Sequence, residues 1–193
     1  MPIKEDYRGN VSTLGPRACY DESKRLGETL CYVYDTYFNL HTNIIRPFNI
    51  YGPGMMQYDY RVMPNFASCI KKGVNLKVYG DGRQTRTFCY ITDAIAGFLK
   101  VIANGGKGSP YNIGNPKPEI TMDALADLFI TVGNKKILKD ISAYPDSYPS
   151  DEPMRRCPDI SKAINDLNYI PKIDLDEGVA KFLGWSDEHY TAD

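Results

Sequence analysis

The sequence has few of the residues that usually mark metal sites and disulfide frameworks. Its 193 residues include two histidines and five cysteines, and the cysteines are widely spaced, odd in number and never in a Cys-x-x-Cys pattern. This spacing argues against a zinc site or a disulfide framework and is typical of reduced thiols in a reducing compartment. We therefore predict a protein without a metal centre that is located in the cytoplasm.

Long apolar runs and an excess of charge of one sign are also missing. No apolar stretch approaches the roughly 20 residues that a membrane-spanning helix needs. The 23 basic and 24 acidic residues leave a net charge of −1, and the basic residues are scattered. Neither a membrane segment nor a nucleic-acid partner is therefore predicted. The hydrophobic content of 42% is typical of a globular protein with a substantial core.

A long helix is predicted near the N-terminus, over residues 17–38. Its apolar residues recur every three or four positions, at Leu26, Leu30, Val33 and Tyr37. A second apolar side is formed by Cys31, Tyr32, Tyr34 and Phe38. A helix that is apolar on two sides is expected to bury both, one on its own sheet and one elsewhere.

Tyr20 and Lys24 lie four residues apart in this helix and therefore share one face. A phenol is a weak base, but a neighbouring ammonium group stabilises the phenolate. Tyr20 could then exchange a proton with a sugar hydroxyl while a hydride leaves the same carbon. A tyrosine merely packed beside a lysine is the alternative that this short motif leaves open.

Four longer blocks strengthen the first interpretation. They are residues 15–25 (GPRACYDESKR), 46–55 (RPFNIYGPGM), 78–88 (VYGDGRQTRTF) and 151–159 (DEPMRRCPD). Together they closely resemble the extended short-chain dehydrogenases/reductases that act on nucleotide sugars, the NAD-dependent epimerase/dehydratase family. Within that family the sequences of these blocks are most similar to those of the UDP-glucuronic acid decarboxylases, also called UDP-xylose synthases.

The resemblance implies an enzyme that uses NAD to decarboxylate UDP-glucuronate through a 4-keto intermediate. Tyr20 and Lys24 would be catalytic and would contact NAD, together with Phe48. Asn49, Arg61, Tyr79, Arg86 and Arg156 would bind the UDP-sugar. Arg86 is the preferred diphosphate ligand because guanidinium offers phosphate oxygens a planar, permanently charged fork. Arg83 is a weaker candidate that is expected to face solvent, and Arg155 stays open beside Arg156. The family also pairs the Tyr20/Lys24 helix with a partner's copy, so a homodimer is expected, and a fully buried core helix in a monomer is the alternative.

The remaining pattern predicts an α/β fold. Further helices are expected over 61–72, 93–103, 121–132, 159–167 and 174–183, and strands over 42–46, 76–79, 86–91, 111–113 and 137–141. The predicted caps are Thr92, Thr121 and Asp159, with Asp174 and Glu177 as a capping box. The 93–103 helix is expected to bury Ile95, Phe98, Leu99 and Ile102. Residues 144–158 are interpreted as an irregular loop, and those from Trp185 onward as a frayed tail.

The glycine-rich turn that receives the NAD pyrophosphate in this family is not found in the sequence. The chain is therefore expected to form the C-terminal part of a Rossmann-type doubly wound parallel sheet plus a small α/β substrate-binding domain. Residues 1–52 with 84–115 would form the first and 53–83 with 116–193 the second. Weak or no catalysis is expected from this chain alone. A 4-epimerase, a 4,6-dehydratase, and a non-catalytic nucleotide-sugar-binding or dimerisation module remain alternatives.

Overall fold

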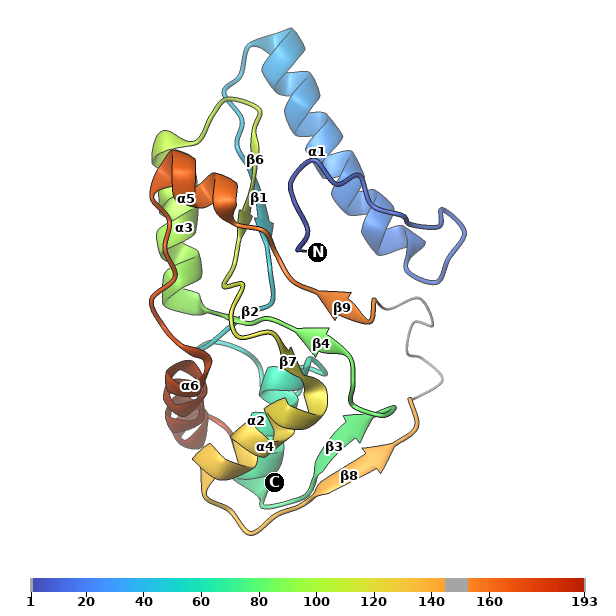
Figure 1. Ribbon diagram of the computed structural model, residues 1–193, viewed down its shortest axis with the longest axis vertical. Coiled ribbons are helices and arrows are strands. Elements are labelled where there is room, and N and C mark those ends of the chain that lie inside the picture. Colours follow the sequence, from blue (N-terminus) through green and yellow to red (C-terminus); the bar gives the residue numbers. More distant parts are fainter. Residues whose placement is uncertain (1, 145–152, 193) are drawn as a thin grey trace.

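A computed structural model describes residues 2–144 and 153–192, which form a mixed α/β fold (Figure 1). The helices are α1 (Ala18–Phe38), α2 (Val62–Lys72), α3 (Ile91–Asn104), α4 (Met122–Gly133), α5 (Ser161–Leu167) and α6 (Leu175–His189). The strands are β1 (Ile44–Pro47), β2 (Ile50–Tyr51), β3 (Leu76–Tyr79), β4 (Thr85–Arg86), β5 (Cys89–Tyr90), β6 (Pro110–Ile113), β7 (Ile120–Thr121), β8 (Lys139–Ser142) and β9 (Arg155–Arg156).

The first lobe is built on the parallel pair β1–β6, in which Ile45 is registered with Tyr111. Figure 1 shows α3 and α5 on one side of this pair and α1 on the other. Parallel strands with helices on both faces are typical of doubly wound folds. The apolar cluster of this lobe consists of Val101, Tyr111, Ile113, Ile160, Ala163, Leu167 and Tyr169.

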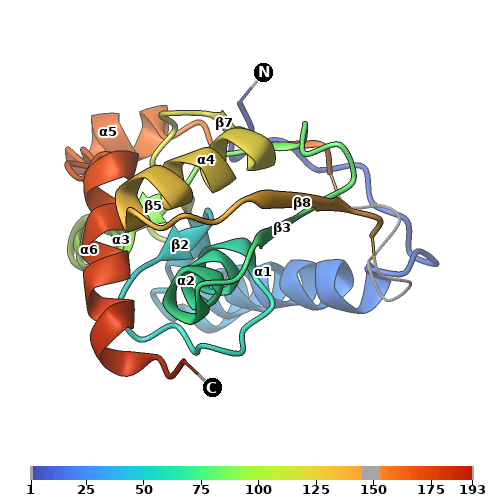
Figure 2. The same ribbon diagram turned by 90° about the horizontal axis from the view of Figure 1, so that it is seen from below.

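The second lobe is built on the parallel pair β3–β8, which lies between α4 and α2, with α6 beside them (Figure 2). Its core is aromatic: Tyr51 packs edge-on against Phe182, and Phe66 packs edge-on against Phe129, with ring centroids 6.1 and 5.5 Å apart. Edge-to-face packing at these distances is favourable for aromatic rings. The short parallel pair β2–β5 lies between the two lobes.

The structure confirms the type of most predicted elements and moves some of their ends. β3 has its predicted bounds, and Thr121 caps α4 by accepting a hydrogen bond from the Ala124 amide at 3.1 Å. Thr92 is not a cap, because α3 already begins at Ile91. The single strand predicted over 86–91 is divided into β4 and β5, and β9 lies in the stretch interpreted as irregular. Within that stretch, residues 145–152 lie outside the described residues.

The C-terminal helix is longer than predicted. Residues from Trp185 onward are not a frayed tail, since α6 continues to His189 and Tyr190 is buried. The Trp185 ring stacks on Phe182 with centroids 6.1 Å apart, which buries part of the indole against the core. Asp174 occupies the predicted N-cap position, but its side chain makes no capping hydrogen bond.

The buried face predicted for α3 is wrong for three of its four residues, since only Phe98 packs against the apolar cluster. Ile95, Leu99 and Ile102 are exposed, and the helix packs through Ala94, Gly97 and Val101. A side chain at Gly97 would collide with Ile113 and Tyr169, so the glycine lets the helix approach the sheet closely. Small residues therefore define the contact face, whereas the apolar pattern pointed to the larger residues on the outside.

Helix α1 also departs from the prediction, because no residue in it is buried in the described chain. Leu26, Leu30 and Tyr37 are 59%, 47% and 74% exposed. The helix ends at Phe38, and the following Asn39 caps it with a left-handed backbone (φ 53°) and an amide N–H that donates to the Tyr34 carbonyl. Within residues 2–144 and 153–192, no helix is long and apolar enough to cross a membrane.

Candidate functional site

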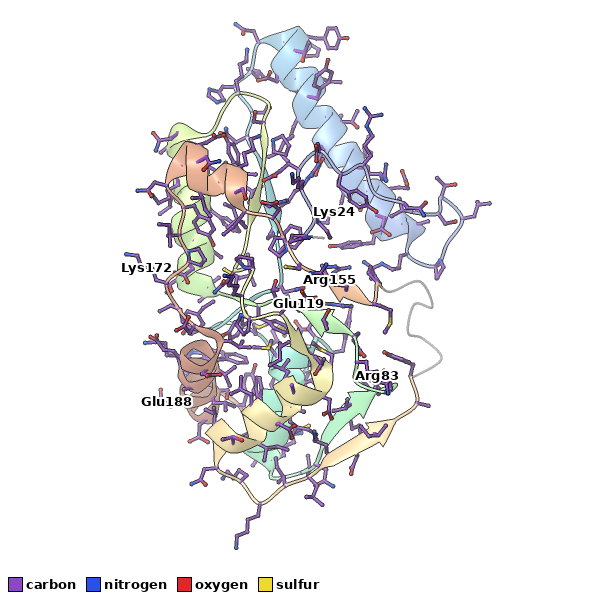
Figure 3. The ribbon with its side chains drawn as sticks, in the orientation of Figure 1. Lys24, Arg83, Glu119, Arg155, Lys172 and Glu188 are labelled. Atoms are coloured by element: carbon purple, nitrogen blue, oxygen red, sulfur yellow. The ribbon has the colours of Figure 1, made fainter. Side chains whose placement is uncertain are left out.

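Helix α1 places Tyr20 and Lys24 on one exposed face, as the spacing predicted. The Tyr20 side chain is 57% exposed, and the Lys24 ammonium lies 5.4 Å from the centroid of its ring. Figure 3 shows Lys24 on the side of α1 that faces the rest of the molecule. The Arg17 guanidinium also lies 5.4 Å from the ring. Arg17 is not among the predicted site residues, although its i, i+3 spacing to Tyr20 could have indicated this second cation.

A two-bond ion pair connects α1 to strand β1. Arg46 Nε donates to Glu28 Oε1 at 2.7 Å, and Arg46 Nη2 donates to Glu28 Oε2 at 2.6 Å. The third guanidinium nitrogen, Nη1, donates to the Glu5 carbonyl at 2.8 Å. The hydrogen bonds to Glu28 raise the pKa of Arg46. This pair orients the Tyr20/Lys24 helix relative to the strand that ends at the next candidate residues.

Phe48 and Asn49 follow β1 at the carboxyl end of the strand, where ligands gather in open α/β sheets. Phe48 is buried, and its amide donates to the Ile113 carbonyl at 2.9 Å. Asn49 has a positive φ of 44°, a conformation that asparagine tolerates better than most residues. Its Nδ2 donates to the Thr87 carbonyl at 2.8 Å. Asn49 therefore shapes the turn, and its carbonyl oxygen Oδ1 is the atom left to consider for a ligand.

Arg86 and Arg156 lie next to each other although 70 positions separate them in sequence. They are registered partners on the parallel strands β4 and β9. Registered residues of neighbouring strands point to the same face of a sheet. Arg86 is buried, and its Nη1 donates to the carbonyls of Thr85 and Met154, at 2.8 and 3.3 Å. Two arginines in register on neighbouring strands are suited to a multiply charged anion such as a diphosphate.

Arg83 and Arg155 occupy different surroundings. The Arg83 side chain is 83% exposed beside Asp81, which confirms that it faces solvent. Arg155 donates from Nε and Nη2 to the two carboxylate oxygens of Glu119, at 2.6 and 2.7 Å. These bonds, and one from Thr85, lower the pKa of Glu119 to about 2. Figure 3 shows Arg155 and Glu119 side by side.

Arg61 and Tyr79 lie in the second lobe, at the start of α2 and at the end of β3. Arg61 precedes α2 and pairs with Asp59, whose Oδ1 accepts from the Arg61 amide at 2.9 Å and whose Oδ2 accepts from Arg61 Nε at 2.8 Å. These hydrogen bonds lower the pKa of Asp59. Tyr79 stacks on Tyr144 with ring centroids 6.1 Å apart.

Two hollows are found on the surface of the described residues. One, of about 350 Å³, is lined by Met56, Tyr58, Asp59, Tyr60 and Arg61. The other, of about 600 Å³, is lined by residues near Lys4 and α5 and includes none of the predicted site residues. Of the candidate residues, Arg61 lines the smaller hollow, and neither hollow is lined by the Tyr20/Lys24 pair or by the arginine pair of β4 and β9.

Parallel strands covered by helices on both sides are typical of a Rossmann-type α/β fold, and α1 adds an exposed Tyr-x-x-x-Lys face. A sequence profile described as the NAD dependent epimerase/dehydratase family matches residues 2–114. The chain belongs to this family.

Curated relatives support the same grouping. The chain is 42% identical over 184 residues to UDP-glucuronic acid decarboxylase 1 of Arabidopsis thaliana, covering 94% of this chain and 40% of the relative. It is 39% identical over 182 residues to UDP-glucuronic acid decarboxylase 1 of Xenopus tropicalis, covering 94% and 42%. The predicted resemblance is thereby confirmed, and the chain spans less than half the length of these two relatives.

Solved structures confirm the fold. The UDP-glucuronic acid 4-epimerase from Bacillus cereus, in complex with UDP-glucuronic acid and NAD, is 28% identical with a TM-score of 0.81. The alignment covers 95% of this chain and 58% of the epimerase. The dTDP-glucose 4,6-dehydratase from Streptomyces venezuelae has a TM-score of 0.83 at 24% identity, covering 97% and 55%. The predicted Rossmann-type α/β fold is correct.

Proposed function

We propose that this chain supplies the proton-transfer and substrate-binding residues of an NAD-dependent UDP-glucuronate decarboxylase. The observation that carries the proposal is the register of Arg86 with Arg156, which brings two predicted diphosphate ligands together from distant parts of the sequence. The names of the curated relatives favour decarboxylation, and the Tyr20–Lys24 contact supports proton transfer. The proposal also divides the chain into a Rossmann-type part, residues 1–52 with 84–115, and a substrate-binding part, residues 53–83 with 116–193.

The chain holds residues suited to the nicotinamide end of NAD. Tyr20 and Lys24 are exposed on α1 and can donate hydrogen bonds to a ribose, and Phe48 lies at the end of β1. NAD, when bound, would accept a hydride from C4 of the sugar and return it later. The glycine-rich turn that receives the pyrophosphate of NAD is not within the 193 residues, so the proposal assigns to this chain only the nicotinamide end of the cofactor site.

In the proposed reaction, Tyr20 removes the proton of the C4 hydroxyl as that carbon is oxidised. The resulting 4-keto sugar acid is a β-keto acid; it loses carbon dioxide to leave an enolate, which takes up a proton from water at C5. Tyr20 then returns a proton to the C4 oxygen as the ketone is reduced. Lys24 and Arg17 hold positive charge beside the Tyr20 ring and favour its phenolate form.

The substrate's diphosphate would bind between Arg86 and Arg156, with Asn49, Arg61 and Tyr79 as further contacts. Holding the remote nucleotide positions the sugar ring for proton transfer, which is how binding energy away from the reacting atoms contributes to catalysis. This arrangement serves epimerases and dehydratases equally well, so a 4-epimerase or 4,6-dehydratase is the second candidate, supported by the similar solved structures.

Product analysis separates these reactions. The natural polypeptide that carries this chain is incubated with NAD and UDP-glucuronate, and the nucleotide sugar is examined by mass spectrometry. Carbon dioxide and a UDP-pentose support decarboxylation. An isomer of unchanged mass or a dehydrated product contradicts it in favour of the second candidate. Calorimetry that finds UDP binding but neither NAD binding nor turnover supports a non-catalytic binding module instead.

A homodimer through α1 is part of the proposal. The helix buries none of its described residues and exposes Leu26, Leu30 and Tyr37, so a second copy would cover an apolar surface. Leu30→Glu should shift sedimentation from dimer to monomer, whereas Leu138→Glu, at a 70% exposed leucine elsewhere, should not. Identical sedimentation of both variants and the parent chain would argue against α1 as the interface.

The location proposed is the cytoplasm. All five cysteines are free thiols in the structure, and a reducing compartment keeps them so.

A further inference from the structure

Glu119 connects two strands that carry candidate arginines. The residue lies immediately before β7, and its carboxylate accepts three short hydrogen bonds. Thr85 Oγ1 of β4 donates to Oε1 at 2.6 Å, while Arg155 of β9 donates to both oxygens at 2.6 and 2.7 Å. A carboxylate held by a two-bond guanidinium and a hydroxyl has well-defined geometry. Glu119 therefore bridges β4 to β9 through side chains.

The register places this bridge on one face of the sheet and the arginine pair on the other. Thr85 is the partner of Arg155, and Arg86 is the partner of Arg156. Successive residues of a strand point to opposite faces. Because the side chains of Thr85 and Arg155 meet at Glu119, those of Arg86 and Arg156 belong to the opposite face.

The backbone pairing between β9 and β4 is short. Each of the two strands is two residues long. Just ahead of β9, the Thr85 amide donates to the Met154 carbonyl at 2.9 Å, and Arg86 Nη1 reaches the same carbonyl at 3.3 Å. Strands this short contribute few hydrogen bonds to their own pairing. The side-chain bridge at Glu119 adds a second link between β9 and β4 to these few hydrogen bonds.

We infer that Glu119 is a positioning residue for diphosphate binding. By holding Arg155 against Thr85, it keeps Arg156 beside Arg86, and it occupies two of the donors of Arg155, so that this third guanidinium does not compete for the ligand. The inference rests on the proposed function, in which Arg86 and Arg156 bind the diphosphate. It also assigns Arg155 a structural role rather than direct ligand contact.

The test compares UDP with uridine, which lacks the diphosphate, by calorimetry on the full 193-residue chain. Glu119→Gln should raise the Kd for UDP about tenfold, equivalent to about 1.4 kcal/mol, and change that for uridine by less than about twofold. Glu119→Asp, which keeps the carboxylate, should recover part of the UDP affinity. Glu188→Gln is the matched control, since Glu188 is exposed on α6, far from the bridge (Figure 3).

A second readout does not depend on the ligand. In Glu119→Gln, hydrogen exchange of the Thr85 amide, which bonds to Met154, should be about tenfold faster. The Gly178 amide, which bonds to Asp174 at 2.9 Å in α6, should exchange as in the parent chain. Equal acceleration at both amides would mean a general loss of stability and would overturn the positioning role.

Other outcomes separate this inference from the proposed function. If Arg86→Lys and Arg156→Lys weaken UDP binding but Glu119→Gln does not, the inference is overturned and the proposed function stands. If Glu119→Gln weakens uridine as much as UDP, the effect is not on the diphosphate and the inference is overturned. If the parent chain does not bind UDP, or neither arginine variant changes its affinity, the proposed function fails and the inference fails with it.

Discussion

Glu28 of α1 and Arg46 of β1 form a paired ion bridge with bonds of 2.6 and 2.7 Å. The pair is the main polar connection described between the Tyr20/Lys24 helix and the parallel strands, and Arg46 also bonds to the Glu5 carbonyl. Since no residue of α1 is buried in the described chain, apolar packing contributes less to holding this helix than it does for α2 or α6. The orientation of the proposed catalytic face therefore depends on this ion pair.

Glu28→Gln should reduce the free energy of unfolding by about 1 kcal/mol, because partial exposure screens the pair while Arg46 loses a charged acceptor. Urea denaturation measures this. Glu22→Gln is the control on the same helix, since Glu22 makes a single 3.9 Å contact with Arg25 and should change stability little. Equal effects of the two substitutions would show that the two-bond geometry has no special weight.

Two glycines of α6 should respond oppositely to alanine. A methyl group at Gly178 would overlap the hydroxyl of the buried Tyr51, whereas nothing lies within 4 Å of one at Gly184. Gly178→Ala should therefore cost about 1–3 kcal/mol of stability through overpacking. Gly184→Ala should gain up to about 1 kcal/mol from helix propensity. Melting temperatures that move the same way in both variants would contradict the packing described around Tyr51.

The pKa of Glu119 predicts part of the acid sensitivity of the fold. Hydrogen bonds from Arg155 and Thr85 hold that pKa at about 2, against an ordinary value of 4.5. Because the folded pKa is the lower one, the contribution to stability is complete above pH 4.5 and is lost as the pH falls toward 2. Glu119→Gln should therefore lose less stability than the parent chain across this interval, as measured by denaturation at several pH values. Parallel curves would show that Glu119 is not held as described.

The sequence predicted the local features of the site well. Tyr20 and Lys24 required only a helix with the right spacing, and the α1 periodicity supplied it. The family blocks identified Arg86 and Arg156, and the register of β4 with β9 brings the two together. Their ligand roles stay predictions.

Features that depend on distant contacts were not predictable. Glu119 pairs with Arg155 across 36 positions, and neither the charge pattern nor a motif marks that pairing. In α3, the contact face consists of small residues, so a method that follows large apolar residues selected Ile95, Leu99 and Ile102 instead. The extension of α6 past Trp185 likewise depends on stacking against Phe182. In each case, tertiary packing decides what the local pattern leaves open.

If Tyr20 carries the proton of the sugar hydroxyl, the rate of NADH formation in a single turnover should depend on the Tyr20 hydroxyl group. The natural polypeptide that carries this chain is mixed with NAD and UDP-glucuronate, and the absorbance of NADH is followed in the parent protein and in Tyr20→Phe. Tyr20→Phe should form NADH at least about a hundredfold more slowly, while its Kd for UDP should stay within about twofold of the parent value. NADH formation at the parent rate in Tyr20→Phe would show that Tyr20 does not carry this proton.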